Sequence, residues 1–181
     1  MITVADILAL PAFAQVRPLT RRARSKVREV RNVGILDCPP DKDDGYLSYV
    51  PGEFIVSNLG FARDDPELSE RSLLVLIARG VSAIALKQVY SPIVSERVVD
   101  AAEEAGIPLY LYDGAYHEVV AYQALDLIRR DAEQSDKGRI LDGLLSGHDA
   151  QATRAALFEL AGVTGSTVQC VAVAPQGTDD C

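Results

Sequence analysis

The chain has 181 residues, of which 48% are hydrophobic and 24% charged, an ordinary composition for a folded globular protein. This length allows one α/β domain and a remainder. No apolar run approaches the roughly 20 residues that a membrane-spanning helix needs, and the first residues lack the basic start of a secretory signal, so we expect a cytoplasmic protein without membrane contact.

The net charge of −8 is unevenly distributed along the chain. Residues 17–31 hold seven of the eighteen basic residues and one acid, whereas the rest of the chain is strongly acidic. One interpretation is a contact with nucleic acid or another acidic surface. The other, favoured because the run lacks aromatic residues, is a solvated β-ribbon whose long side chains discourage edge-to-edge pairing.

Cysteines and histidines give no indication of a metal site. Cys38, Cys170 and Cys181 are far apart and form no CxxC pair, which favours reduced thiols over a disulfide framework. Neither His117 nor His148 has a second ligand at metal-binding spacing. The sequence therefore predicts no bound metal and no cofactor.

The predicted elements begin with a short helix, because Thr3 to Asp6 fits a capped helix start and Pro11 closes it. Four short apolar runs that end in turn residues are predicted to be strands: residues 30–36, 54–56, 81–86 and 108–111. Helices are predicted between them, at residues 64–80 and 95–106, since each range opens with a capping residue and ends at glycine.

Strands that alternate with helices at this spacing are typical of βαβ units, whose crossovers produce a mainly parallel sheet. We therefore predict an α/β fold with a largely parallel open sheet and flanking helices, followed by a long C-terminal helical segment. Small ligands of such sheets usually bind beyond the carboxyl ends of the strands.

Polar residues at the predicted strand ends form a candidate ligand site. We expect a small effector to contact the following residues: Glu53, Ser57, Asn58, Lys87 and Asp113. If Lys87 points inward it needs an anionic partner, and Glu53 is the candidate in the motif. The alternative is structural: Ser57 or Asn58 only satisfies backbone amides near a turn, and Lys87 reaches water.

The adjacent His117 and Glu118 are the residues that suggest acid–base chemistry. No serine, cysteine or second histidine is arranged with them, and glutamate is favoured at a helix start in any case. We therefore predict no catalytic residue and no enzymatic activity.

Residues 117–146 are predicted to be helical and carry two apolar stripes separated by a polar band. The two stripes are Val120, Ala124, Leu127 and Ile128, then Ile140, Leu141, Leu144 and Leu145. We expect the first stripe to pack on the sheet and the second on a partner helix or a further domain, and we assign the stretch to homodimerisation as a hypothesis.

Five segments resemble, in order, the N-terminal domain of the purine-catabolism regulator (PucR-type) transcription factor family. They are TVADILALPAF, VREVRNVGILDCPPD, GYLSYVPGEFIVSNLGFARDD, LIARGVSAIALK and AAEEAGIPLYLYD. In the third segment, residues 51–54 (PGEF) stand where the family has a Pro-Gly-Glu-Leu or Gly-Gly-Glu-Leu turn. The segment departs from the family pattern at Tyr46, where a tryptophan is usual, and at Ser57 and Asn58, where two threonines are usual.

The sequence ILDGLLSGHDAQATRAALFELAG, followed by a predicted strand at residues 168–173, resembles the start of the family's GGDEF-like middle domain. The resemblance implies a sensor domain at residues 1–116, a helical linker or dimerisation segment at 117–147, and a truncated middle domain at 148–181.

This family resemblance also implies a function. It implies a regulatory domain that senses a purine-related metabolite or an amino acid, with DNA bound through a C-terminal domain absent here. A ligand-free dimerisation module and a small α/β enzyme domain are the alternatives.

Overall fold

The structure is a computed structural model that describes residues 1–165 except 22, 24–26, 42–44 and 147–149. The chain divides into two compact units, Met1–Ala132 and Glu133–Cys181. Within the described residues, no helix is long and apolar enough to cross a membrane.

Unit 1 is built on a sheet of five strands in the order β1-β5-β4-β3-β2. The strands are β1 (Phe13–Pro18), β2 (Asn32–Leu36), β3 (Glu53–Ser57), β4 (Ala83–Lys87) and β5 (Leu109–Gly114). Strands β2 to β5 are parallel neighbours, and β1 pairs antiparallel with β5. The predicted α/β fold with a largely parallel sheet and a long helix late in the chain is confirmed.

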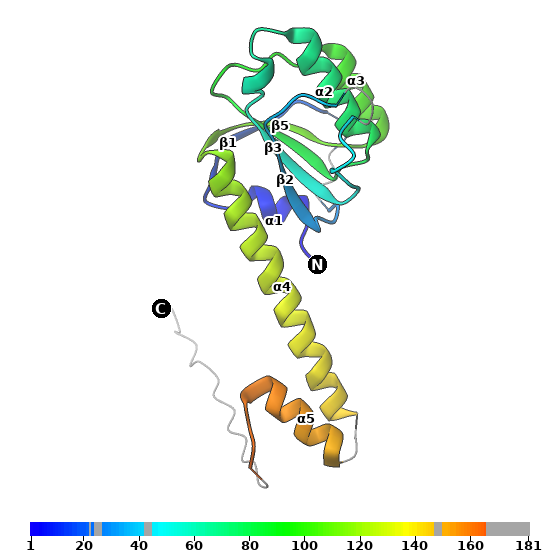
Figure 1. The fold of residues 1–181 in the computed structure, drawn as a ribbon, viewed down its shortest axis with the longest axis vertical. Coiled ribbons are helices and arrows are strands. Elements are labelled where there is room, and N and C mark those ends of the chain that lie inside the picture. Colours follow the sequence, from blue (N-terminus) through cyan, green and yellow to red (C-terminus); the bar gives the residue numbers. More distant parts are fainter. Residues whose placement is uncertain (22, 24–26, 42–44, 147–149, 166–181) are drawn as a thin grey trace, which may run out of the picture. The chain divides into compact units, whose positions relative to one another are not determined.

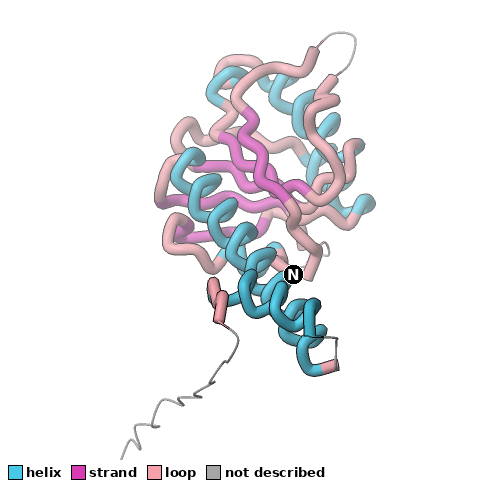
Figure 2. The backbone as a smooth tube through the Cα atoms, turned by 60° about the horizontal axis from the view of Figure 1, so that its bottom comes forward, coloured by secondary structure: helices cyan, strands magenta, loops and turns pink. Residues whose placement is uncertain are grey.

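Helices cover both faces of this sheet, whose strands form a central layer in Figure 2. On one face lie α2 (Pro66–Ala78) and α3 (Glu96–Ala105), and on the other lie α1 (Val4–Leu8) and the beginning of α4 (His117–Leu145), as Figure 1 shows. Each face has its own apolar core. Successive side chains of a strand point to opposite faces, so Val56 belongs to the α4 side and Ile55 to the α2 side.

The helix starts follow from local capping chemistry. Thr3 and Asp6 form a capping box at α1, Asp65 accepts a hydrogen bond from the Leu68 amide at α2, and Ser95 does the same for Val98 at α3. Such side chains satisfy amides that the first turn of a helix leaves without a partner. The predicted positions of these three helices are therefore confirmed.

Strand β1 and the basic run next to it differ from the sequence prediction. Gln15 has a φ of 48° and the pairing with β5 shifts register between Ala14 and Arg17, so the alternation that marks a strand is broken. In the described part of the basic run, Arg17 and Pro18 lie in β1, Glu29 forms an isolated antiparallel β-bridge with Thr3, and the other residues are turn or loop. The predicted β-ribbon is therefore wrong for the residues described.

The two apolar stripes of the long helix α4 lie in different surroundings. Val120 and Ala124 are buried in the core on the α4 side of the sheet, and Leu127 and Ile128 pack against that core. The two buried residues, Val120 and Ala124, are therefore not available as a dimer surface. The second stripe belongs to unit 2, which also contains α5 (Ala150–Ala161). The predicted strand at 168–173 lies outside the described residues.

Candidate functional site

The carboxyl ends of the parallel strands bring part of the predicted site together. Ser57 pairs with Leu86 in the register of β3 and β4, so Asn58 and Lys87 lie at the same edge of the sheet. Lys87 in turn pairs with Tyr112 on β5, which places Asp113 at this edge as well. We call it the carboxyl edge.

Glu53 lies at the opposite end of β3 and does not join this group. Its buried carboxylate accepts hydrogen bonds from Asn32 Nδ2 at 2.7 Å and from the Val50 amide at 3.1 Å. The expectation that Glu53 pairs with Lys87 is therefore wrong. The carboxylate nearest to Lys87 is that of Asp113, with 3.9 Å between Nζ and Oδ1.

Strand alternation also separates the remaining residues by face. Ser57 is fully buried on the α2 side, where its Oγ donates to the Leu36 carbonyl at 2.6 Å and accepts from the Leu59 amide at 2.9 Å. Asn58 Oδ1 accepts from the Gly60 amide at 2.8 Å. Both side chains thus support the turn after β3, which was the structural alternative.

On the α4 side of the sheet, Lys87, Tyr112, Gly114 and Tyr116 form what we call the Lys87 cluster. The Lys87 ammonium donates a hydrogen bond to the Gly114 carbonyl and lies 5.7 Å from the ring centroid of Tyr112 and 5.2 Å from that of Tyr116. The Lys87 side chain is 6% exposed, so aromatic faces replace water around most of it. The exposed carboxylate of Asp113 lies at the open side of the cluster.

Two polar atoms on the α4 side of the sheet are buried without a hydrogen-bond partner among the described residues: the Tyr112 hydroxyl and His117 Nδ1. Burial, with a smaller effect of the Glu118 carboxylate, raises the pKa of Tyr112. The other ring nitrogen of His117 lies 3.3 Å from Glu118. The candidate site predicted from sequence did not include Tyr112 and Tyr116, because neither stands in a motif: the β4–β5 register places Tyr112 beside Lys87, and the segment after β5 brings Tyr116 to it.

A small cavity of about 80 Å³ lies on the α2 side of the carboxyl edge. It is bounded by the turn after β3, the short 3-10 helix η1 (Gly60–Ala62), the start of α2 and the loop after β4. Asn58 and Ser69 line it, and the guanidinium of Arg63 lies 5.3 Å from the ring centroid of Tyr90 at the same cavity. We call it the Ser69 cavity.

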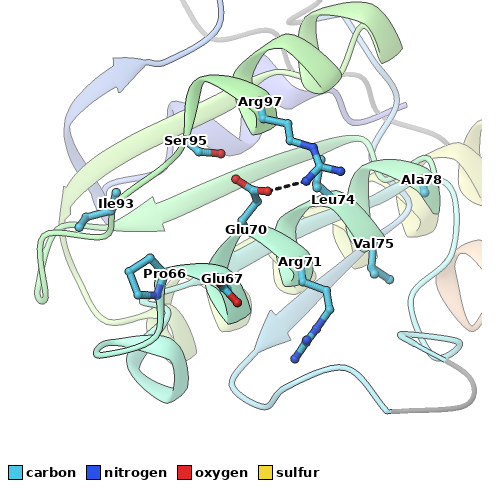
Figure 3. Close-up of a pocket in the computed structure, with 10 residues that line it drawn as sticks. All are labelled: Pro66, Glu67, Glu70, Arg71, Leu74, Val75, Ala78, Ile93, Ser95 and Arg97. Atoms are coloured by element: carbon cyan, nitrogen blue, oxygen red, sulfur yellow. Dashed lines mark hydrogen bonds and ion pairs between the residues drawn. The ribbon is translucent and has the colours of Figure 1, made fainter.

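A larger groove of about 720 Å³ runs between α2 and α3 and is drawn in Figure 3. Glu70 and Arg97 point toward each other across it and form an ion pair at 2.8 Å. Hydrogen bonds from Ser95 and then Arg97 lower the pKa of Glu70. Glu67 and Arg71 also line the groove, so its lining holds two acids and two arginines and has no net charge to attract a charged ligand.

The parts of the chain that the structure describes contain no candidate metal site. No group of three or more His, Cys, Asp or Glu side chains is arranged there to hold a metal ion.

The fold and the site define an α/β domain whose polar groups gather at the carboxyl edge of its sheet. No family model matches the chain, and no curated protein matches it. Among solved structures, the chain is similar to the CBS and DRTGG domains of the regulatory region of Clostridium perfringens pyrophosphatase, solved in complex with the activator diadenosine tetraphosphate.

This similarity has a TM-score of 0.43 and 12% sequence identity, and it covers 66% of this chain and 43% of that chain. At this level it carries no argument about function, which has to rest on the residues of this chain.

Proposed function

We propose that residues 1–116 form the effector-sensing domain of a bacterial PucR-type transcriptional regulator. Residues 117–147 are then its helical linker, and residues 148–181 begin a GGDEF-like middle domain. The resemblance of five consecutive segments supports the family assignment. The polar carboxyl edge of a mainly parallel sheet supports ligand binding, since such edges are the usual ligand sites of open α/β folds.

The observation that carries the proposal is the position of Lys87. The buried ammonium of Lys87, at the end of β4, donates to the carbonyl of Gly114, the last residue of β5, from which the chain leads into α4. An effector that competes for this ammonium changes the contact that fixes the segment leading into α4. Binding at the carboxyl edge is thereby coupled to the helix that leaves the domain.

The energies fit a regulatory switch of ordinary size. A hydrogen bond to a charged group contributes about 1.5–3 kcal/mol. A coupling free energy of about 1–3 kcal/mol between two sites already changes affinity several-fold to a hundredfold. An effector that replaces the Gly114 carbonyl as the hydrogen-bond partner of Lys87 can therefore supply enough free energy for such a switch.

The chemistry of the Lys87 cluster selects the class of effector. An ammonium takes a carboxylate or a ring carbonyl as its partner, and a flat ring stacks on an exposed tyrosine such as Tyr116. A purine-breakdown product or an amino acid offers such groups. In the proposed regulator, the second stripe of α4 forms a homodimer, and DNA is bound through a C-terminal domain outside these residues.

A thermal-shift screen of purine metabolites and amino acids tests the proposal. A ligand that binds only the folded state contributes about 2.7 kcal/mol at a hundredfold excess over its dissociation constant. We expect at least one compound to raise the melting temperature of the wild type, and Lys87→Ala to abolish the shift. Lys137→Ala removes an exposed lysine outside unit 1 and is the matched control.

Two outcomes contradict the proposal. If no compound shifts the melting temperature, the ligand-free dimerisation module is the better interpretation. If Lys87→Ala and Asn58→Ala both keep the full shift, the effector binds elsewhere.

A further inference from the structure

The Ser69 cavity is a second place at the carboxyl edge where a ligand fits, on the face of the sheet opposite to the Lys87 cluster. Its lining is Asn58, Leu59, Ala62, Arg63, Pro66, Ser69, Tyr90, Ser91, Pro92 and Ile93. None of these ten residues is acidic, although acids are the commoner charged residues of the chain.

Ser69 supplies the first hydrogen-bond donor of the cavity. It is 4% exposed, and its Oγ has no hydrogen-bond partner in the part of the chain that the structure describes. Buried hydroxyl groups are normally hydrogen-bonded, because a buried group without a partner loses its contacts with water and gains nothing in return. A group that enters the cavity restores this contact.

Asn58 and Arg63 supply further donors. Asn58 Oδ1 accepts from the Gly60 amide, which orients the side chain and leaves its Nδ2 group to donate. The Arg63 guanidinium stacks on Tyr90 and, within the described residues, forms no ion pair. Three side chains with donors therefore meet at one small cavity, and no carboxylate lines it.

The size of the cavity limits what it holds. About 80 Å³ is more than the roughly 30 Å³ that one water molecule takes in the liquid, so a carboxylate group fits in the cavity. The side chains of Tyr90 and Ile93 are exposed at the rim and offer apolar surface to the remainder of a ligand.

The charge around the cavity favours a monoanion. Asp64, Asp65 and Glu67 adjoin Arg63 and Pro66 in the sequence, and they repel a doubly charged phosphate more than a singly charged carboxylate. We propose that the Ser69 cavity binds the carboxylate of a small organic acid with a short apolar substituent. The site needs neither Lys87 nor a regulatory role, so it stands independently of the function proposed above.

Titration of the full chain with sodium isobutyrate, followed by two-dimensional amide NMR, tests this assignment. We expect saturable shifts of the amides of residues 58–63 and of Ser69, with sodium chloride as the ionic-strength control. Ser69→Ala and Arg63→Gln each weaken binding about tenfold, which equals about 1.4 kcal/mol. Arg97→Gln, an exposed arginine on α3, leaves the affinity unchanged.

Ser69→Ala removes a buried hydroxyl without a partner, so we expect this variant to keep its fold. A loss of binding in this variant is then due to the missing hydroxyl and not to unfolding. An absence of saturable shifts, or equal affinity in wild type and both cavity variants, overturns the proposal. Sodium phosphate is the third arm of the titration. Tighter binding of phosphate than of isobutyrate overturns the carboxylate assignment.

Discussion

Lys87 and Tyr112 lie opposite each other on the neighbouring parallel strands β4 and β5, with the Lys87 ammonium 5.7 Å from the ring centroid of Tyr112. The tyrosine ring shields the charge, while its own hydroxyl is buried without a hydrogen-bond partner in the described part of the chain. Tyr112 thus stabilises the cluster through the face of its ring, whereas its buried hydroxyl is unfavourable.

Tyr112→Phe removes only that hydroxyl, so we expect the free energy of unfolding to rise by about 1 kcal/mol, because a buried donor without a partner is itself destabilising. Urea denaturation monitored by circular dichroism measures the change. Tyr46→Phe is the matched control, since the Tyr46 hydroxyl donates to the Cys38 carbonyl at 2.7 Å.

The control is expected to lose about 1 kcal/mol, the net contribution of a typical hydrogen bond. A loss of the same size in Tyr112→Phe would show that the Tyr112 hydroxyl has a bound partner, such as an ordered water or a ligand.

Gly114 joins β5 to the segment before α4 and is constrained by its surroundings as well as by its backbone. It has a φ of 114°, and a Cβ atom there would lie 2.9 Å from the Ala14 nitrogen and even closer to the Ala12 carbonyl oxygen. Backbone atoms cannot move aside as a flexible side chain does. We expect Gly114→Ala to destabilise unit 1 by about 3 kcal/mol or more, from conformational strain and overpacking together.

Gly106→Ala separates these two causes. Gly106 also has a positive φ, of 65°, but a Cβ atom there would have no neighbour within 4 Å. Only the cost of the left-handed conformation remains, about 1–2 kcal/mol. Chemical denaturation of both variants gives the comparison, and equal losses would contradict a role for the contact between Gly114 and strand β1.

Much of the fold was predictable from sequence because its signals are local. The N-caps Thr3, Asp65 and Ser95 act within one helical turn, and Gly106 ends α3 in the left-handed conformation that favours glycine. Short apolar runs between such helices then specify parallel strands. The unpredicted strand β1 lacks a local signal, since the positive φ of Gln15 and the register shift interrupt its alternation.

The candidate site was predicted less well, because it depends on strand register and on which face each side chain points to. Asn58, Lys87 and Asp113 lie at one edge of the sheet, as predicted, but Glu53 lies at the other end of its strand. Ser57 and Lys87 lie on opposite faces, since Lys87 shares its face with Ala85 and not with Leu86. A one-residue difference in register decides this, and no local motif encodes it.

The capping box of α1 predicts a pH dependence of stability. Hydrogen bonds to the Asp6 carboxylate, from the Thr3 hydroxyl at 2.6 Å and then from the Thr3 amide at 2.8 Å, lower the pKa of Asp6 below 3.8. The native state therefore holds its proton less tightly than the unfolded state. This contribution is present above the unfolded pKa and is lost as the pH falls through the native one.

Asp6→Asn removes this titration, so we expect wild-type stability to fall more steeply than that of the variant below about pH 4. The difference is about 1 kcal/mol or less, the usual contribution of an exposed cap. Asp100→Asn, at an exposed position of α3, is the control and should retain the wild-type pH dependence. Denaturation midpoints measured from pH 7 to pH 3 give the comparison, and parallel curves for wild type and Asp6→Asn would contradict the expected role of the cap.

The proposed homodimer depends on the second stripe of α4, in which two of the three leucines are exposed in the single chain. Leu141 is 50% exposed and Leu145 is 85% exposed. Exposed substitutions of this kind usually change the free energy of unfolding by less than about 0.5 kcal/mol. Charges placed in an apolar interface oppose association, because they lose hydration without gaining a partner. We therefore expect Leu141→Glu with Leu145→Glu to convert a dimer into a monomer that keeps its fold.

Sedimentation velocity at high micromolar concentration measures this change, and circular dichroism checks that the variant stays folded. Leu125→Glu is the matched control, since Leu125 is 43% exposed on α4 but lies in unit 1, outside the second stripe. A wild type that sediments as a monomer would remove the dimer hypothesis. A dimer that Leu125→Glu dissociates and the double variant does not would place the interface on the part of α4 that belongs to unit 1, where Val119 and Tyr122 are also exposed.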